Sequence, residues 1–232
     1  MIKIKQMNKR YDDKIILDDV SLDINRGEII GLLAPNATGK TTLLKILGGQ
    51  KCFDSGEYEF LGEVFEAAHK AHIGYMPSSG MFPLNWRIKD TVNFYQHHFT
   101  TFNLEKCQNM LTEFKLEPKM RLKNLSKGIE EKLYLALAMS IDASLYILDE
   151  PLAAVDILAR DVVIEKIMKT FNADSTILIA THLVADIEVM LDRVLFLKNG
   201  CIVENVLVED LRASGKSVVS RYKEVFSDED IC

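Results

Sequence analysis

Apolar and polar positions follow different periods in different parts of this chain. Ile2 and Ile4 alternate with lysines, which predicts a half-exposed strand, and a second strand is predicted over Lys14–Ile24. Ile29–Leu33 is apolar throughout, which predicts a strand buried on both faces. Further short strands are predicted at residues 58–61, 73–76, 145–148 and 176–180.

Between about residues 78 and 140 the strand patterns disappear and a helical period takes over. Helices are predicted over residues 89–102, 104–114 and 130–141. These positions predict a helical lobe inserted into an α/β core.

The second half of the chain returns to strands. A helix over residues 159–171 separates two predicted strands, and this β-α-β order predicts a parallel sheet with a right-handed crossover. Two further strands, residues 193–197 and 201–206, flank Asn199-Gly200, a dipeptide that favours a type I′ hairpin turn. Residues 212–232 are polar and are expected to form a partly helical tail, with the final SDEDIC frayed.

Composition narrows the class of protein. The 232 residues are 48% hydrophobic and 27% charged, with a net charge of −6, which is typical of a globular domain with a substantial core. No basic block stands out, so no nucleic-acid partner is expected. The four cysteines are widely spaced, which favours free thiols in a reducing compartment. No signal peptide is expected at the N-terminus, and no apolar stretch reaches the length of a membrane span.

The first candidate chemistry follows the buried strand that ends at Leu33. A loop leads there into the helical pattern KTTLLKIL, and backbone N–H groups at such a helix start can surround phosphates. Lys40 is expected to contact the β- and γ-phosphates, and the Thr41 hydroxyl is expected to bind Mg²⁺. The residues expected to contact the nucleotide are Asn36, Ala37, Thr38, Gly39, Lys40, Thr41 and Thr42.

This loop departs from the G-x-x-x-x-G-K-[ST] pattern, because Ala34 replaces its first glycine. The methyl group of Ala37 is expected to destabilise the loop by on the order of 1 kcal/mol if the φ of this residue is positive. The alternative is a lysine-bearing turn before a helix.

A pair of acids ends another apolar strand. Asp149 and Glu150 follow residues 145–148, and ligands of parallel sheets lie beyond the carboxyl ends of the strands. Asp149 is therefore expected to hold Mg²⁺ through water, and Glu150 to orient and deprotonate an attacking water. The alternative is a surface turn with two solvated acids.

The order of these motifs along the chain resembles that of the ATPase domains of ATP-binding cassette (ABC) transporters. One motif is the phosphate-binding loop of residues 34–42, called the P-loop below. The other motifs that carry the resemblance are Leu125-Ser126-Lys127-Gly128, Leu148-Asp149-Glu150-Pro151, Ala154-Val155-Asp156 and Thr181-His182. The resemblance covers residues 1–211 and implies a P-loop NTPase core with a mainly parallel sheet, an N-terminal antiparallel β subdomain and the helical subdomain. It also implies ATP and Mg²⁺ as cofactors.

The resemblance implies a role for each matching residue. Tyr11 would stack on adenine, although it could instead pack on the core. Ser126, Lys127 and Gly128 would close over the γ-phosphate bound to a second nucleotide-binding subunit, identical or different, and Asp156 would lie at that interface. Catalysis would fall to Lys40, Glu150 and His182, with His182 bonded to the γ-phosphate.

One matching position weakens the expected metal site. Ser78 stands where the family usually has a glutamine that contacts Mg²⁺, and serine could act there only through water. Ala37 likewise stands where the family usually has a glycine. Together with Ala34 and Ala37, Ser78 motivates a second hypothesis, a nucleotide-gated module that hydrolyses little. A third hypothesis is a soluble cassette ATPase acting on ribosomes or DNA, which the acidic single cassette disfavours.

The resemblance also implies an integral membrane transporter subunit as partner. This chain would then lie in the cytoplasm, peripherally at the inner face of the membrane. The candidate contact is an apolar segment after Ser78, with Trp86 as its anchor. Its residues are Met81, Phe82, Pro83, Leu84 and Trp86. The alternative is that these side chains fill the core of the helical lobe. Leu125-Ser126-Lys127-Gly128 is a variant of the family's signature motif, and this variant and the small size resemble the ATPase subunits of bacterial peptide or antibiotic exporters.

Overall fold

The computed structural model describes residues 1–227, so the predicted fraying of SDEDIC falls largely outside the described residues. Two sheets form the core. The smaller sheet is antiparallel and has the order β2-β1-β4-β5. Its strands are β1 (Ile2–Tyr11), β2 (Lys14–Ile24), β4 (Ser55–Phe60) and β5 (Glu63–Val64).

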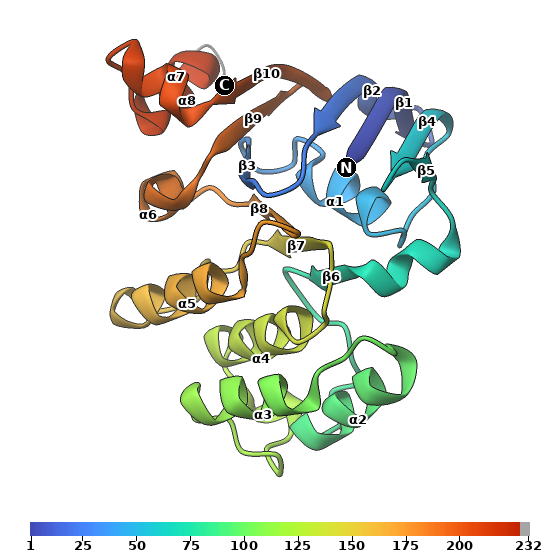
Figure 1. The fold of residues 1–232 in the computed structure, drawn as a ribbon, viewed down its shortest axis with the longest axis vertical. Helices are drawn as coiled ribbons and strands as arrows, with labels where there is room; N and C mark the ends of the chain where they lie inside the picture. The colour runs from blue at the N-terminus through green and yellow to red at the C-terminus, as the bar shows by residue number, and fades with distance from the viewer. Residues whose placement is uncertain (228–232) are drawn as a thin grey trace.

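The larger sheet has the order β10-β9-β3-β8-β7-β6, and it is parallel except where β9 pairs with β10. Its strands are β3 (Ile29–Leu33), β6 (Ile73–Met76), β7 (Leu145–Asp149), β8 (Thr176–Ala180), β9 (Arg193–Lys198) and β10 (Cys201–Leu207). Helix α1 (Lys40–Leu47) lies on one side of this sheet, and α5 (Ile157–Thr170) and α6 (Val184–Ile187) lie on the other (Figure 1).

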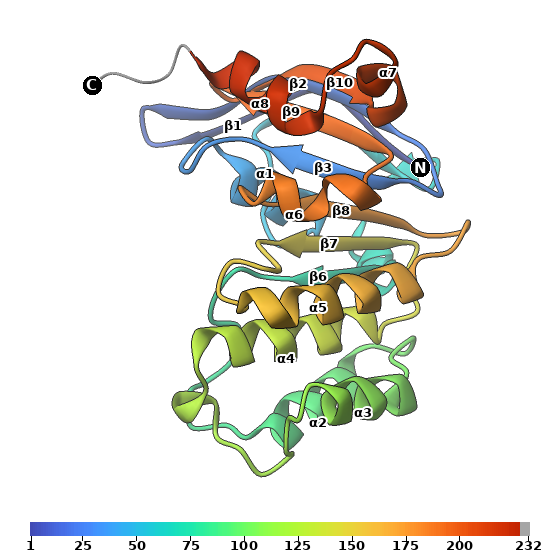
Figure 2. The ribbon, with the colours of Figure 1, turned by 90° about the vertical axis from the view of Figure 1, so that its left-hand side faces the viewer.

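The helical lobe comprises α2 (Ile88–His98), α3 (Leu104–Glu113) and α4 (Lys127–Met139). It gathers at the end of the molecule opposite α7 (Val208–Ala213) and α8 (Val218–Phe226) (Figure 2). Three short 3₁₀ segments complete the description: Ala67–His72, Leu122–Asn124 and Glu188–Met190. The predicted α/β fold, with an antiparallel β subdomain and a helical insertion, is confirmed.

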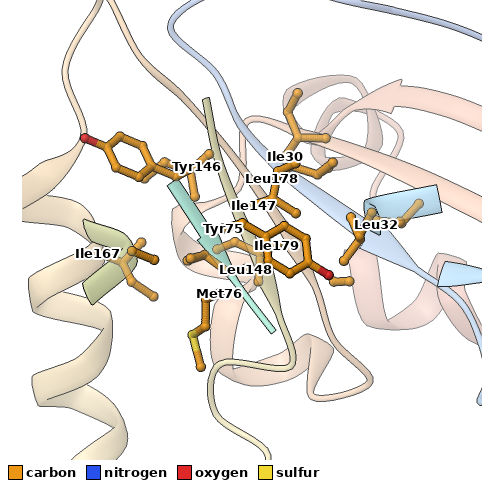
Figure 3. Packing of buried hydrophobic residues seen from close by; sticks show 14 of the residues in the cluster. Ile30, Leu32, Tyr75, Met76, Tyr146, Ile147, Leu148, Ile167, Leu178 and Ile179 are labelled. Carbon is orange, nitrogen blue, oxygen red and sulfur yellow. The ribbon is translucent and has the colours of Figure 1, made fainter. Parts of the chain in front are cut away.

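Central strands of the parallel sheet are buried along their whole length, as their apolar runs predict. Side chains from four neighbouring strands and from α5 pack together there (Figure 3): Ile30, Leu32, Tyr75, Met76, Tyr146, Ile147, Leu148, Ile167, Leu178 and Ile179. This packing fixes the carboxyl ends of β3 and β7, where the candidate chemistry lies.

Several element boundaries differ from the predictions, and two of the differences have a clear local cause. The helix predicted over residues 89–102 ends at His98, because the chain turns extended at Phe99 and Phe102 bridges Ile141. The helix predicted from residue 130 begins at Lys127, because the side chain of Ser126 caps it. Within the polar tail, α8 spans Val218–Phe226, and Phe226 at its end is buried.

Candidate functional site

The loop between β3 and α1 is bound by the side chain of Lys40, the first residue of α1. Lys40 is only 6% exposed, and its Nζ donates to the carbonyl oxygens of Ala34 at 2.6 Å and Pro35 at 2.8 Å. Burial lowers the pKa of Lys40, and the charges of Glu150 and Asp149 partly oppose that shift. The ammonium therefore lies where a phosphate could replace the two carbonyls with stronger, charge-assisted acceptors.

The backbone of this loop is shaped for glycine at two positions. Gly39 has φ 104°, and a Cβ there would lie 2.8 Å from the carbonyl oxygen of Ile16, so a side chain is excluded. Ala37 has φ 64° and therefore adopts the left-handed conformation that an alanine rarely takes. Ala34, the other alanine that replaces a glycine, is not among the residues with positive φ.

Ala37→Gly is expected to stabilise the chain by about 1 kcal/mol, because glycine adopts this φ without the steric cost of a Cβ. Thermal unfolding without nucleotide measures the effect. Ala34→Gly is the matched control, and it should lower Tm, because Ala34 is fully buried and its methyl group fills space in the core. Equal shifts in the two variants would contradict the strain assigned to Ala37.

Asp149 ends β7 beside the start of α1. Its carboxylate is 1% exposed, and its Oδ2 accepts a hydrogen bond of 3.0 Å from the Thr41 hydroxyl. Its Oδ1 is buried and has no hydrogen-bond partner in the described part of the chain. Burial raises the pKa of Asp149, whereas Thr41 and Ser78 act to lower it. A buried carboxylate oxygen without a donor beside a hydroxyl fits a divalent cation with oxygen ligands such as Mg²⁺.

Asp149→Asn is expected to raise Tm in the absence of nucleotide, with the largest gain near neutral pH. Because the folded pKa lies above the ordinary value of 3.8, folding opposes ionisation, and this cost appears as pH rises through the folded pKa. The gain should therefore shrink as the pH falls towards 3.8. Thermal unfolding from acid to neutral pH tests this, and a neutral-pH Tm below that of the wild type would contradict it.

Glu150 and His182 come together at the ends of adjacent strands. The imidazole Nδ1 of His182 lies 2.9 Å from Glu150 Oε2, and the backbone N–H of Glu150 donates to Ala180 O at 2.8 Å. Glu150 has φ 55°, a strained conformation of the kind found at functional sites. The backbone thus holds the Glu150 carboxylate next to both the cavity and the imidazole.

A cavity of about 370 Å³ gathers most of the predicted nucleotide and metal residues. It is lined by Ile16, Asn36, Ala37, Gly39, Lys40, Thr41, Thr42, Ser78, Asp149 and Glu150. Thr38 lines a neighbouring cavity, and its hydroxyl donates to Pro35 O at 2.9 Å. The combination of one ammonium, helix-start amides and two carboxylates can bind a polyphosphate with a divalent cation and activate water.

Tyr11 lies beside this cavity and is 37% exposed. Its pKa is lowered chiefly by Lys51, whose Nζ donates to the phenolic oxygen at 2.6 Å, and also by a hydrogen bond with Thr42. The Lys51 ammonium also lies 4.5 Å from the centre of the Tyr11 ring. The ring of Tyr11 is therefore partly exposed to solvent next to the P-loop.

The remaining predicted residues lie outside the cavity. Ser126 caps α4, where its Oγ accepts from the Ile129 N–H at 3.4 Å, and Lys127 and Gly128 form the first turn. Asp156 caps α5 by accepting from the Ala159 N–H at 3.1 Å. The structure of one chain therefore does not bring these four residues to the residues around Lys40.

Two cavity or loop contacts escaped the sequence analysis. Ile16 lines the cavity, but its place on β2 carries no local signal of a ligand. Glu131 lies in α4 and is buried, and its Oε2 accepts from the Ala154 N–H at 2.9 Å. An acid within a mostly apolar helical run was the only available signal for Glu131.

Comparisons with known proteins give matches to one family. The family model of ABC transporters matches residues 17–153. The ABC transporter ATP-binding protein YtrB of Bacillus subtilis (strain 168) is 30% identical over 91% of this chain and 74% of its own length. The Nod factor export ATP-binding protein I of Burkholderia pseudomallei (strain 1710b) is 32% identical over 86% of this chain and 68% of its own length.

Solved structures support the fold. A structure described as the ATP-binding subunit of an ABC transporter has a TM-score of 0.86 at 23% identity, over 97% of this chain and 98% of the other. A dimeric, post-hydrolysis ATP-binding cassette, MJ0796 bound to ADP and Pi, has a TM-score of 0.79 at 20% identity, over 89% and 98%. Within residues 1–227, no helix combines the length and apolarity that crossing a membrane requires.

Proposed function

This chain belongs to the ABC transporter family as an ATPase subunit, and we propose that it hydrolyses ATP to move a solute through a separate membrane protein. The observation that carries the proposal is the shared cavity at the carboxyl ends of β3 and β7. Lys40, Thr41, Asp149 and Glu150 all line it, although they come from distant parts of the sequence.

ATP would bind with its phosphates on the loop of residues 34–39. Lys40 would leave the carbonyls of Ala34 and Pro35 and contact the β- and γ-phosphates. Thr41 and Asp149 would hold Mg²⁺, with Ser78 contributing through water. When bound, Mg²⁺ would neutralise the charge that develops on the phosphates.

Glu150 and His182 would act on the attacking water. The Glu150 carboxylate would orient the water and accept its proton. The imidazole of His182 lies next to that carboxylate and would hydrogen-bond the γ-phosphate. Both side chains therefore serve the step in which water attacks the γ-phosphorus.

A second nucleotide-binding subunit, identical or different, would complete the site. The amides at the start of α4 would face the γ-phosphate held by that second chain, together with Ser126 and the positive charge of Lys127. Asp156 would lie at the same interface, and Tyr11 would stack on the adenine. This arrangement accounts for the distance of the α4 start from the cavity of its own chain.

The membrane partner would contact the segment after Ser78. Phe82 and Trp86 stack at 5.5 Å within the helical lobe, which disfavours Trp86 as the anchor, whereas Leu84 is 63% exposed. We propose Leu84 as the contact instead.

Residues 1–211 would form the nucleotide-binding domain and residues 212–232 its tail, at the cytoplasmic face of the membrane. The role named for the Burkholderia relative supports an exporter. The signature variant of this chain, residues 125–128, also resembles that of peptide or antibiotic exporters.

Steady-state phosphate release with Mg-ATP, in the presence of the co-purified membrane protein, tests this function. The left-handed Ala37 and the short Ser78 favour a second candidate, a nucleotide-gated module that hydrolyses little. Phosphate release well above that of Glu150→Gln would support the transport ATPase. Equally slow release by the two proteins would support the gated module.

A further inference from the structure

Glu131 is a buried carboxylate that the proposed reaction does not use. It is 3% exposed and lies in the second turn of α4. Burial raises its pKa, the Ala154 N–H and Lys127 lower it, and Glu150 and Glu130 raise it further. Burying an acid for a single amide hydrogen bond is a poor way to stabilise a fold, so its place calls for another explanation.

The residue that Glu131 contacts is held at two points. The Ala154 N–H donates to Glu131 Oε2 at 2.9 Å. On its other side, the carbonyl oxygen of Ala154 lies against Gly128, where a Cβ would approach to 2.3 Å. Helix α4 therefore fixes both the amide and the carbonyl of one loop residue.

That loop connects Glu150 to Asp156 and has few strong internal contacts. Its own hydrogen bonds, from Ala153 N to Glu150 O and from Val155 N to Leu152 O, are both 3.3 Å long. Glu150 at its start is held in the strained φ of 55°. The 2.9 Å bond to Glu131 is thus a shorter polar restraint on the loop than its own two hydrogen bonds, and it acts beside the burial of Leu152 and Val155.

We propose that Glu131 is a positioning residue that ties the Glu150–Asp156 loop to the start of α4. Through Ala154, it keeps the Glu150 carboxylate at the cavity and makes the helix start at Ser126 move together with that carboxylate. This inference rests on the proposed function, because it concerns the same hydrolysis.

Two variants at Glu131 and one neighbour separate this role from general stability. Glu131→Met fills similar space without a strong acceptor, whereas the amide oxygen of Glu131→Gln can accept the same bond. Glu130→Gln is the matched control, because the Glu130 carboxylate accepts from the Tyr134 hydroxyl at 2.5 Å and does not bond Ala154. Phosphate release would give kcat and KM, calorimetry would give ATP affinity, and hydrogen exchange would report on residues 151–155.

Glu131→Met is expected to lower kcat about 10- to 100-fold, as misplacement of a catalytic group does, with ATP affinity within about twofold of the wild type. Amides of the loop should exchange faster in this variant. Glu131→Gln and Glu130→Gln should keep the wild-type kcat and exchange. A wild-type kcat in Glu131→Met, or an equal loss in Glu131→Gln, would overturn the proposal.

The exchange measurement separates this inference from the proposed function. If the wild-type chain hydrolyses no ATP, the proposed function fails. The tie between Glu131 and Ala154 would still be supported by faster loop exchange in Glu131→Met alone, and unchanged exchange would reject it.

Discussion

Glu150→Gln is expected to lower kcat for ATP hydrolysis about 100-fold or more while ATP affinity stays near that of the wild type. A general base contributes roughly 10²- to 10⁴-fold to a rate, and an amide cannot accept the proton of the attacking water. The carboxylate is not expected to hold the phosphates, so binding should be little affected. Phosphate release and calorimetry measure the two quantities separately.

Apart from the loss of a negative charge near Lys40, the substitution is otherwise conservative. Glutamine has the same shape, and its oxygen can accept the bond from His182 that now spans 2.9 Å. The unfavourable φ of 55° affects both residues alike. Glu165→Gln is a useful comparison, because it makes the same change in an acid of α5 that pairs with Lys169 and does not line the cavity. If Glu150→Gln kept more than about a tenth of the wild-type kcat, another group would have to be the base.

The ends of the parallel strands were the part of the site that the sequence predicted well. Lys40 and Asp149 each follow an apolar run that is long enough for a strand but too short for a helix. A parallel sheet brings the carboxyl ends of such strands to one edge. Topology alone therefore predicted their approach, and the structure places both residues in one cavity.

Contacts between layers could not be predicted in the same way. The bond between Ala154 and Glu131 depends on how the helical lobe packs against the loop after β7, which no local pattern specifies. Trp86 shows the same limit, since an apolar residue in a loop can face a partner or the lobe itself, and only the structure shows it stacked on Phe82.

The sequence predicted backbone strain only on the condition that φ is positive. The match of Ala37 to a glycine position indicated strain if its φ were positive, and the observed φ is 64°. The same argument could not separate Ala37 from Ala34, since both replace glycines. The separation comes from the loop path, which turns left-handed at Ala37 and at Gly39 but not at Ala34.

Lys40→Met is expected to weaken ATP binding about 100-fold. The variant keeps the buried apolar stem but removes the ammonium, which would contact oxygens of two phosphates. Hydrogen bonds to charged groups are worth about 1.5–3 kcal/mol each, and about 2.7 kcal/mol corresponds to a 100-fold change in affinity. Calorimetry measures the affinity, and the smaller increase of Tm on adding ATP gives an independent estimate.

Lys45→Met is the matched control for this change. Lys45 lies in the last turn of the same helix α1 and does not line the cavity. Its loss should reduce helix stability slightly, because a positive charge near a helix C-terminus is favourable, but it should leave ATP affinity unchanged. The buried position of Lys40 sharpens the comparison, because among residues 1–227 its ammonium now bonds only the carbonyls of Ala34 and Pro35. In Lys40→Met both carbonyls would lose the ammonium with or without nucleotide, although Pro35 O would keep the Thr38 hydroxyl as a donor. If the ammonium serves only to close the loop, Lys40→Met should therefore lower the Tm of the free protein and leave ATP affinity intact, whereas a phosphate-binding lysine requires the affinity itself to fall.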